Sequence, residues 1–480
     1  MGPTLEELAQ QLAEGLATSE RLVEECLGRI DDPSGQGADT FLGVAHESAR
    51  AAARGMDLLR QSGAAPSRYA GIPVSIKDLF DLKGEVTRAG SLVLKDAPAA
   101  KEDAAAVARL KAAGFIVIGR TNMTEFAFSG IGINPHYGTP KNIYNRAHAR
   151  VPGGSSSGAA ISITDLMAHG ALGTDTGGSC RIPAAFNGIV GYKPTARRVP
   201  LAGAFPLSMT LDSIGPLART VSCCAILDAV LTGEEPKAPC KHPVTGLRIA
   251  VPKAYVMNDM DADVAEAFSR TLALLEKNGA VLTELAFSEI DAIPSANAKG
   301  GFSAPESLST HRAHIATHAD LYDTRVLTRI ERGHEQSAAD YVDLVRERAR
   351  IIRAFEERMI NYDCLAYPTT PIIAPQISAF HTDEDFARLN MLVLRNPAVI
   401  NFLDGCAISL PMTKPPAACC RGPATLNGRT ITACKGLVLV WLISAVSIAN
   451  LATAYSSRTV VSAWMMRGMS SAHNPCCPPP

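Results

Sequence analysis

Apolar residues recur at helical spacing near the start of the chain. Four leucines follow one another every three or four positions, which places them on one face of a helix: Leu5, Leu8, Leu12 and Leu16. Ser19 provides an N-cap for a second helix. A polar, glycine-rich break at 31–39 separates that helix from a third helical stretch at 47–61. The pattern therefore predicts a group of N-terminal helices.

Short β-branched runs then alternate with helical patterns. Buried strands are predicted at 72–76, 115–118, 247–251 and 365–367, and helices at 104–113 and 261–278. Alternation of this kind is typical of an α/β fold with a largely parallel or mixed sheet.

The middle of the chain, at 128–220, has a different pattern. It is dense in Gly, Ser, Thr, Asn and Pro, yet apolar helix-like runs such as 159–167 interrupt it. Long polar loops inside a compact domain are usually functional or disordered. The interleaved apolar runs favour ordered loops around a site.

Composition and charge narrow the classes of function. The 480 residues exceed the usual size of one core, so two domains or one unusually large sheet are both open. Apolar residues make up 47% and charged residues 19%, as in a compact, core-forming protein. The net charge is −1 and no Lys/Arg run occurs, so we expect no nucleic-acid partner.

The N-terminus and the cysteines indicate a cytoplasmic protein. The first residues lack the basic-then-apolar pattern of a secretory signal. The twelve cysteines show no disulfide-framework or CxxC spacing, and six of them form adjacent pairs: Cys223 with Cys224, Cys419 with Cys420, and Cys476 with Cys477. We therefore expect reduced thiols, no metal site and no cofactor.

Three segments carry the candidate chemistry: GIPVSIKDLF with Lys77, VPGGSSSGAA with Ser155, and LGTDTGGSCRIPAAFNG with Ser179. Taken singly, each has an ordinary explanation, because GGSSSG is more often a flexible linker and a lone lysine is usually a solvated charge. No Walker lysine and no dinucleotide-binding glycine pattern accompanies them.

Together the three segments fit a serine nucleophile, which needs a base, hydrogen-bond donors for the developing oxyanion and tight backbone geometry. Two glycines precede Ser179, and the backbone N–H groups that could turn toward one oxygen are those of Thr176, Gly177, Gly178 and Ser179. Asp175 and Arg181 flank this loop with opposite charges and could hold it from behind.

Lys77 is the available base, because none of the eleven histidines lies in these segments. A free lysine has a pKa of about 10.4, so a neutral Lys77 requires burial that lowers its pKa. The apolar run at 72–76 provides that kind of surrounding.

Residues 153–195 resemble the signature of the amidase signature family, GGSS…GTDTGGSxRxPAAFxGxxGxKPT. The two serines are 24 residues apart, as in that family, and GIPVSIKD resembles the segment of its upstream lysine. The similarity extends from the N-terminal helices through 119–130 to 401–411. The resemblance implies an α/β/α sandwich around a large mixed, mostly parallel twisted sheet with N-terminal helices.

The resemblance also implies domain boundaries. An amidase signature domain is expected at 1–412, followed by an atypical tail at 413–480. Within the domain we expect N-terminal helices at 1–62, a catalytic core at 63–220, and the substrate cleft with the remaining sheet at 221–412.

The resemblance assigns roles to individual residues. Ser179 is the nucleophile that forms the acyl-enzyme, Ser155 follows a cis peptide bond and bridges Ser179 to Lys77, and Lys77 is the base. The N–H groups named above line the oxyanion hole, and Ala127 and Ser155 contact the substrate. The expected partner is a small-molecule amide, and similar proteins are often homodimers.

The expected reaction is hydrolysis of a carboxamide, anilide, carbamate or urea-derived C–N bond. The first alternative is the glutamine-hydrolysing component of a tRNA amidotransferase. Those proteins resemble RQPASFCG and YGRVSRYGL, whereas this chain has RIPAAFNG and ARRVPLAGAF. The second alternative is an inactive or membrane-tethered product with a damaged C-terminus.

The tail motivates that second alternative. From Thr413 to the end there is no Asp or Glu, and 436–455 is uncharged over a length sufficient to span a bilayer. The resemblance implies a further strand and a final helix here, and neither is recognisable. We therefore expect the sheet to lose its usual ending near Thr413, through an altered reading frame, a divergent tail or a membrane anchor.

Two further features receive structural interpretations. His311, His314 and His318 share helical spacing, but they lack a carboxylate partner, so a solvated or cleft-edge helix is favoured over a metal site. Cys180 follows the predicted nucleophile by one residue and is interpreted as a buried apolar side chain.

Overall fold

The computed structural model describes residues 2–239, 243–412, 425–426, 429–430 and 436–441. Its described part contains an eleven-stranded sheet in the order β1-β3-β2-β4-β6-β5-β10-β13-β9-β7-β8. The strands are β1 (Phe41–Val44), β2 (Pro73–Lys77), β3 (Ile116–Thr121), β4 (Gly170–Thr174), β5 (Val190–Lys193), β6 (Ile214–Ala218), β7 (Arg248–Pro252), β8 (Val281–Leu285), β9 (Cys364–Pro368), β10 (Cys406–Pro411) and β13 (Gly436–Trp441). The short strands β11 (Thr425–Leu426) and β12 (Arg429–Thr430) form a separate pair.

The sheet is mixed. Strands β2, β3 and β4 run parallel to one another, as do β7, β8 and β9. The six other neighbouring pairs, which include all those between β4 and β9, are antiparallel. The predicted strands correspond to β2, β3, β7 and β9, so the prediction of an α/β fold around a large mixed sheet is confirmed.

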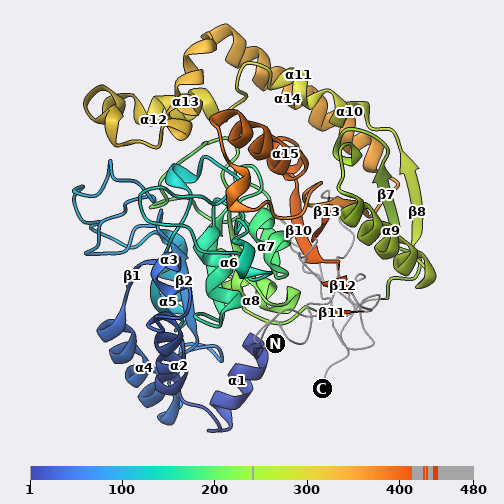
Figure 1. Cartoon of the computed structure of the whole chain (residues 1–480). Helices are drawn as coiled ribbons and strands as arrows, with labels where there is room; N and C mark the ends of the chain where they lie inside the picture. The colour runs from blue at the N-terminus through green and yellow to red at the C-terminus, as the bar shows by residue number, and fades with distance from the viewer. Residues whose placement is uncertain (1, 240–242, 413–424, 427–428, 431–435, 442–480) are drawn as a thin grey trace.

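Helices accompany the strands in the described part. They are α1 (Leu5–Ala13), α2 (Ser19–Ile30), α3 (Gly37–Thr40), α4 (His46–Gln61), α5 (Ala105–Ala112), α6 (Ser157–Thr164), α7 (Arg181–Asn187), α8 (Val221–Thr232), α9 (Ala262–Lys277), α10 (Ser288–Asp291), α11 (Ile293–Ala296), α12 (Ser303–His318), α13 (Thr324–Glu331), α14 (Ala338–Met359) and α15 (Asp383–Phe402). Figure 1 shows α1, α2 and α4 gathered at one side of the molecule and β7, β8 and α9 at the other, with α12, α13 and α15 above the centre.

Two hydrophobic cores cover opposite faces of the sheet. Leu172 of β4 packs in the core that contains α5 and α8, whereas its neighbour Ala171 packs in the core that contains α4 and α6. Successive side chains of a strand point to opposite faces. Strand β4 is therefore buried on both sides, as are all five residues of β2.

The N-terminal helices differ from the prediction in detail. Helix α1 ends at Ala13, so Leu16 lies outside it and is 63% exposed. The N-cap of α2 is Thr18, whose hydroxyl accepts a hydrogen bond from the N–H of Arg21, and Ser19 is the first helical residue. A threonine at this position satisfies the same free donors as the predicted serine.

The expectation that the sheet loses its ending near Thr413 was wrong. Gly436–Trp441 forms β13, which pairs antiparallel with β10 on one side and with β9 on the other. The backbone groups of β9 and β10 are therefore paired rather than left at an open edge. The rest of the predicted apolar segment, 442–455, lies outside the described residues. Within the described residues, no helix combines the length and apolar character needed to cross a membrane.

Candidate active site

The three candidate segments meet at the ends of two parallel strands. Lys77 is the last residue of β2 and Thr174 is the last residue of β4. Because these strands are parallel neighbours, their carboxyl ends lie at the same edge of the sheet. Ser155 shortly precedes the start of α6, and Ser179 lies in the loop between β4 and α7. Segments about 100 residues apart are thus brought together.

Lys77 is fully buried and contacts two hydroxyl groups. Its Nζ lies 2.7 Å from Ser155 Oγ and 2.8 Å from Thr174 Oγ1. Burial lowers the pKa of Lys77 to about 8, although the negative charges of Asp212 and Asp175 oppose this change. The predicted Lys77–Ser155 contact is therefore present. Thr174 was missed, and its position at the end of an apolar run beside the glycine-rich loop was the available signal.

The peptide bond between Gly154 and Ser155 is cis, as the resemblance implied. Backbone hydrogen bonds hold this turn on both sides. The N–H of Gly154 donates to the carbonyl of Gly130, and the N–H of Thr124 donates to the carbonyl of Ser155. The loop after β3 therefore fixes the position from which the Ser155 hydroxyl reaches Lys77.

Asp175 holds the glycine-rich loop from behind. Its carboxylate accepts hydrogen bonds from the N–H groups of Gly178 and Cys180, and from the guanidinium of Arg181 at 2.9 and 3.0 Å. Burial alone would raise the pKa of Asp175, but the Arg181 guanidinium outweighs it and lowers the pKa to about 2. Asn401 of α15 also donates to this carboxylate. The supporting arrangement predicted for Asp175 and Arg181 is present.

This arrangement corrects one predicted oxyanion donor. The N–H of Gly178 donates to Asp175, so it does not point toward the substrate side of the loop. Among the described residues, no acceptor binds the N–H groups of Thr176, Gly177 and Ser179. Gly178 has φ +125, and a Cβ there would lie 2.5 Å from Pro397. Its role is therefore to form the turn.

The buried pair of Asp175 and Arg181 makes a prediction about stability. Replacing Arg181 with methionine leaves the Asp175 carboxylate buried without its cation, which we expect to lower the free energy of unfolding by about 3–5 kcal/mol. Urea unfolding followed by circular dichroism measures this loss. An exposed pair such as Arg346 and Asp343 serves as the control, because Arg346→Met should change it by less than about 1 kcal/mol. Equal losses for both variants would contradict the proposed anchoring of the loop.

Thr176 is held by a second carboxylate that sequence reasoning missed. Its hydroxyl donates to Asp212, which also accepts hydrogen bonds from the backbone N–H groups of Leu207 and Ser208. Burial raises the pKa of Asp212 to about 6. Asp212 lies 36 residues beyond Thr176, and no spacing rule connects the two positions in the sequence.

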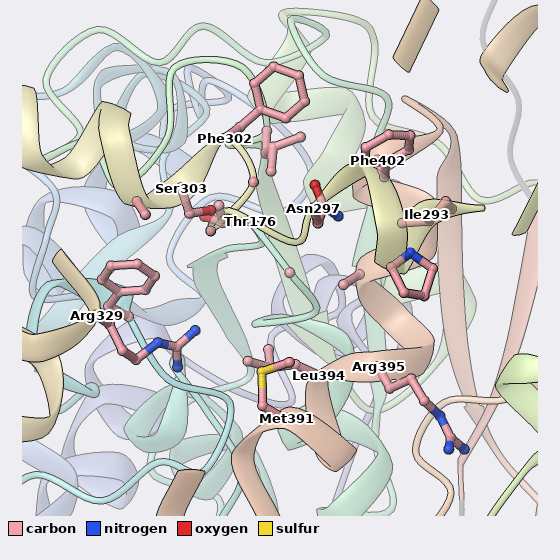
Figure 2. Close-up of a pocket in the computed structure, with 18 of the residues that line it drawn as sticks. Thr176, Ile293, Asn297, Phe302, Ser303, Arg329, Met391, Leu394, Arg395 and Phe402 are labelled. Carbon is pink, nitrogen blue, oxygen red and sulfur yellow. The ribbon is translucent and has the colours of Figure 1, made fainter. Parts of the chain in front are cut away.

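Ser179 and Ala127 line one cavity of about 860 Å³, together with Thr176 and Gly177 (Figure 2). Ala127 has φ +60 and lies in the short helix Glu125–Ala127, which β3 precedes. Helices α12, α13 and α15 supply much of the remaining wall. The structure therefore places the predicted substrate-contacting position Ala127 and the predicted nucleophile in the same cavity.

The two alternative groups have different environments. Cys180 is fully buried, its Sγ contacts the carbonyl of Gly215 at 3.5 Å, and burial raises the pKa of its thiol. The interpretation as a buried side chain is confirmed. His311 differs from the prediction, because it is buried and its Nδ1 contacts the hydroxyl of Tyr322 at 3.0 Å. Phe126 and Phe205 surround its ring, which is why this helix face is not solvated.

Residues 21–424 match the sequence profile of the family described as Amidase. The chain belongs to the amidase family. It is accordingly a hydrolase that acts on amide C–N bonds, as predicted. The amidase signature that covers Lys77, Ser155 and Ser179 lies within the matched residues.

Individual relatives agree with this assignment. The chain is 36% identical to 2-amino-5-chloromuconic acid deaminase of Comamonas testosteroni over 371 residues, which are 76% of this chain and 79% of that protein. It is 33% identical to the GatA-type component of the glutamyl-tRNA(Gln) amidotransferase of Lacticaseibacillus paracasei, over 79% of this chain and 84% of that protein. A crystal structure of an amidase superposes with a TM-score of 0.79 at 29% identity, covering 92% of this chain and 95% of the other.

Proposed function

We propose that this amidase hydrolyses a small-molecule amide through an acyl-enzyme on Ser179, with Ser155 and Lys77 transferring protons. The observation that carries this proposal is the fully buried Lys77, whose Nζ contacts Ser155 Oγ at 2.7 Å. A lysine with a lowered pKa provides a neutral amine near neutral pH, which is the form a general base requires.

The proposed reaction begins with proton transfer. Neutral Lys77 accepts the proton of the Ser155 hydroxyl while Ser155 accepts the proton of Ser179, and Ser179 Oγ attacks the carbonyl carbon. The N–H groups of Thr176, Gly177 and Ser179 stabilise the negative oxygen of the tetrahedral intermediate. The C–N bond then breaks as the proton on Lys77 returns through Ser155 to the leaving nitrogen. Water hydrolyses the acyl-enzyme by the same proton path.

The pH profile tests the role of Lys77. Because the neutral amine is the active form, kcat/KM should rise about tenfold per pH unit below pH 8 and level off above it. The unfolded chain binds more protons than the folded one between pH 8 and about 10.4 at this residue. Its contribution to stability therefore rises with pH through that window. Initial rates on an uncharged amide such as butyramide from pH 5.5 to 9.5 measure the profile.

The control for this measurement is the folded fraction at each pH, followed by circular dichroism. A profile that is flat from pH 6 to 9 would contradict the proposal. A single inflection near pH 6 would instead assign the titration to Asp212, whose pKa is raised to about 6.

A second candidate function is the glutamine-hydrolysing component of a tRNA amidotransferase. The 33% identity to such a protein over 84% of its length supports it. The name of the 36% identical relative, a deaminase of a muconic acid, supports a small-molecule substrate instead. Hydrolysis of free glutamine together with a copurifying partner protein would favour the amidotransferase. Turnover of small amides by the isolated chain would favour the amidohydrolase.

We also propose that residues 1–412 act as one domain in the cytoplasm. One hydrophobic core extends from Leu5 of α1 to Met412 after β10, which supports a single folding unit. The described part contains six unpaired buried thiols, at Cys26, Cys180, Cys223, Cys224, Cys364 and Cys406. Reduced thiols of this kind are typical of a reducing compartment.

A further inference from the structure

We propose that Arg329 binds a carboxylate of the substrate, so that the preferred substrate is an amide that also carries a carboxylate group. This inference rests on the proposed function, because it places the carboxylate in the cavity that contains Ser179. Arg329 lies on α13 and lines that cavity.

The cavity has an excess of positive charge. Four arginines line it, against one acidic residue, Asp259. Three of the four lie within 4 Å of a carboxylate: Arg332 pairs with Glu335, Arg388 with Asp385, and Arg395 with Asp259. The charge of these three is therefore compensated within the protein, and Arg329 is the arginine that remains.

Arg329 has no carboxylate partner among the described residues. Its Cζ lies 4.5 Å from the centre of the Phe128 ring, and its Nη1 is buried without a hydrogen-bond acceptor. Burial lowers the pKa of Arg329 to about 10, and the nearby charge of Arg332 adds to the effect. The guanidinium is still protonated at neutral pH. A buried, charged donor without an acceptor is costly unless a ligand supplies one.

The orientation of Arg329 fits a ligand contact. Figure 2 shows its guanidinium pointing from α13 toward the middle of the cavity, whereas the Arg395 guanidinium points away from it. Phe128 supports the guanidinium from one side, which limits its rotation. A planar guanidinium held in this way can donate two parallel hydrogen bonds to a carboxylate.

The rest of the cavity suits the body of such a substrate. Its apolar wall includes Leu207, Met391 and Leu394, and its catalytic side includes Thr176 and Ser179. An amide group at Ser179 and a carboxylate at Arg329 would be joined by a short hydrocarbon linker along this wall. The carboxylate could belong to the acyl part, as in a half-amide of a dicarboxylic acid, or to the amine part, as in an N-acylglycine.

Binding to the Ser179→Ala variant tests this inference without hydrolysis. Malonamate, succinamate and glutaramate would be titrated by calorimetry beside the uncharged diamides of the same lengths, and N-acetylglycine beside its amide. At least one acid should bind about 10- to 100-fold more tightly than its uncharged counterpart. The pair that shows the difference identifies which part of the substrate carries the carboxylate.

Substitutions of Arg329 assign the effect to this side chain. In the Ser179→Ala background, Arg329→Gln should remove the preference for the acid, and Arg329→Lys should retain only part of it, since an ammonium lacks the planar fork. The matched control is Arg325→Gln on the same helix, because the Arg325 guanidinium pairs with Asp323 at 2.8 Å. Arg325→Gln should leave the preference unchanged.

The outcomes separate this inference from the proposed function. Acid-selective binding that Arg329→Gln abolishes, together with a wild-type protein that hydrolyses no amide, would uphold the inference and reject the function. Hydrolysis of uncharged and acidic amides at equal rates, or acid binding that survives Arg329→Gln, would overturn the inference. A purely structural arginine would lower Tm when replaced. We expect Arg329→Gln to keep or raise Tm, because it removes an unpaired buried charge.

Discussion

Replacing Ser179 with alanine is expected to abolish amide hydrolysis, with a loss in kcat of about 10⁴- to 10⁶-fold. The alanine has no oxygen to attack the carbonyl carbon, and no other described nucleophile shares its position in the cavity beside Thr176 and Gly177. The measurement is the initial rate on a panel of aliphatic amides, anilides and carbamates. A covalent adduct of acyl mass should form on wild-type protein during turnover and be absent from Ser179→Ala.

Cys180→Ala is the matched control for this prediction. It changes the adjacent residue, whose raised thiol pKa makes it a poor nucleophile, so turnover should stay within a few fold of wild type. Both variants should fold, which circular dichroism and Tm can check. Retained turnover in Ser179→Ala combined with loss in Cys180→Ala would reject the serine mechanism in favour of a cysteine nucleophile.

Replacing Lys77 with methionine should have the next largest effect, a loss of about 10²- to 10⁴-fold in kcat. Methionine approximates the volume of the lysine chain but cannot accept the proton from Ser155. The protein should remain folded, because a lysine whose pKa is lowered to about 8 destabilises the folded state when it is protonated at neutral pH. Stopped-time assays on the best substrate of the panel, with urea unfolding of both proteins, measure the two effects.

Lys193 provides a matched control for Lys77. It is also fully buried, and burial lowers its pKa to about 8, but its Nζ donates to the carbonyl oxygens of Pro194 and Gly405. Lys193→Met should lower stability by about 1–3 kcal/mol, since those carbonyls lose their donor, while turnover per folded molecule is retained. If Lys77→Met lost stability and Lys193→Met lost turnover, the roles assigned to the two lysines would be reversed.

Much of the site was predictable because its chemistry is local in the sequence. The two glycines before Ser179, the cis-bonded Ser155 and the apolar run before Lys77 each require residues within a few positions of one another. The strands β2, β3, β7 and β9 were predicted for the same reason, since their burial requires continuous apolar runs.

The details that were missed depend on contacts between distant residues. Thr174 reaches Lys77 only because β2 and β4 are parallel neighbours, and the N–H of Gly178 is engaged only because Asp175 folds back beneath the loop. The tail was misjudged for a related reason. The apolar residues of 436–441 suit a strand between β10 and β9 as well as a membrane segment, and pattern alone does not separate the two.

The sequence by itself determined the family, the α/β fold and the residues that carry the chemistry, because those depend on residue types at short spacing. The tertiary structure decided which of these groups are neutral, paired or free to act. Burial sets the pKa of Lys77, and the partners of Arg332, Arg388 and Arg395 leave Arg329 without one among the described residues. Desolvation and ion pairing act through space, so they follow from the fold and not from position along the chain.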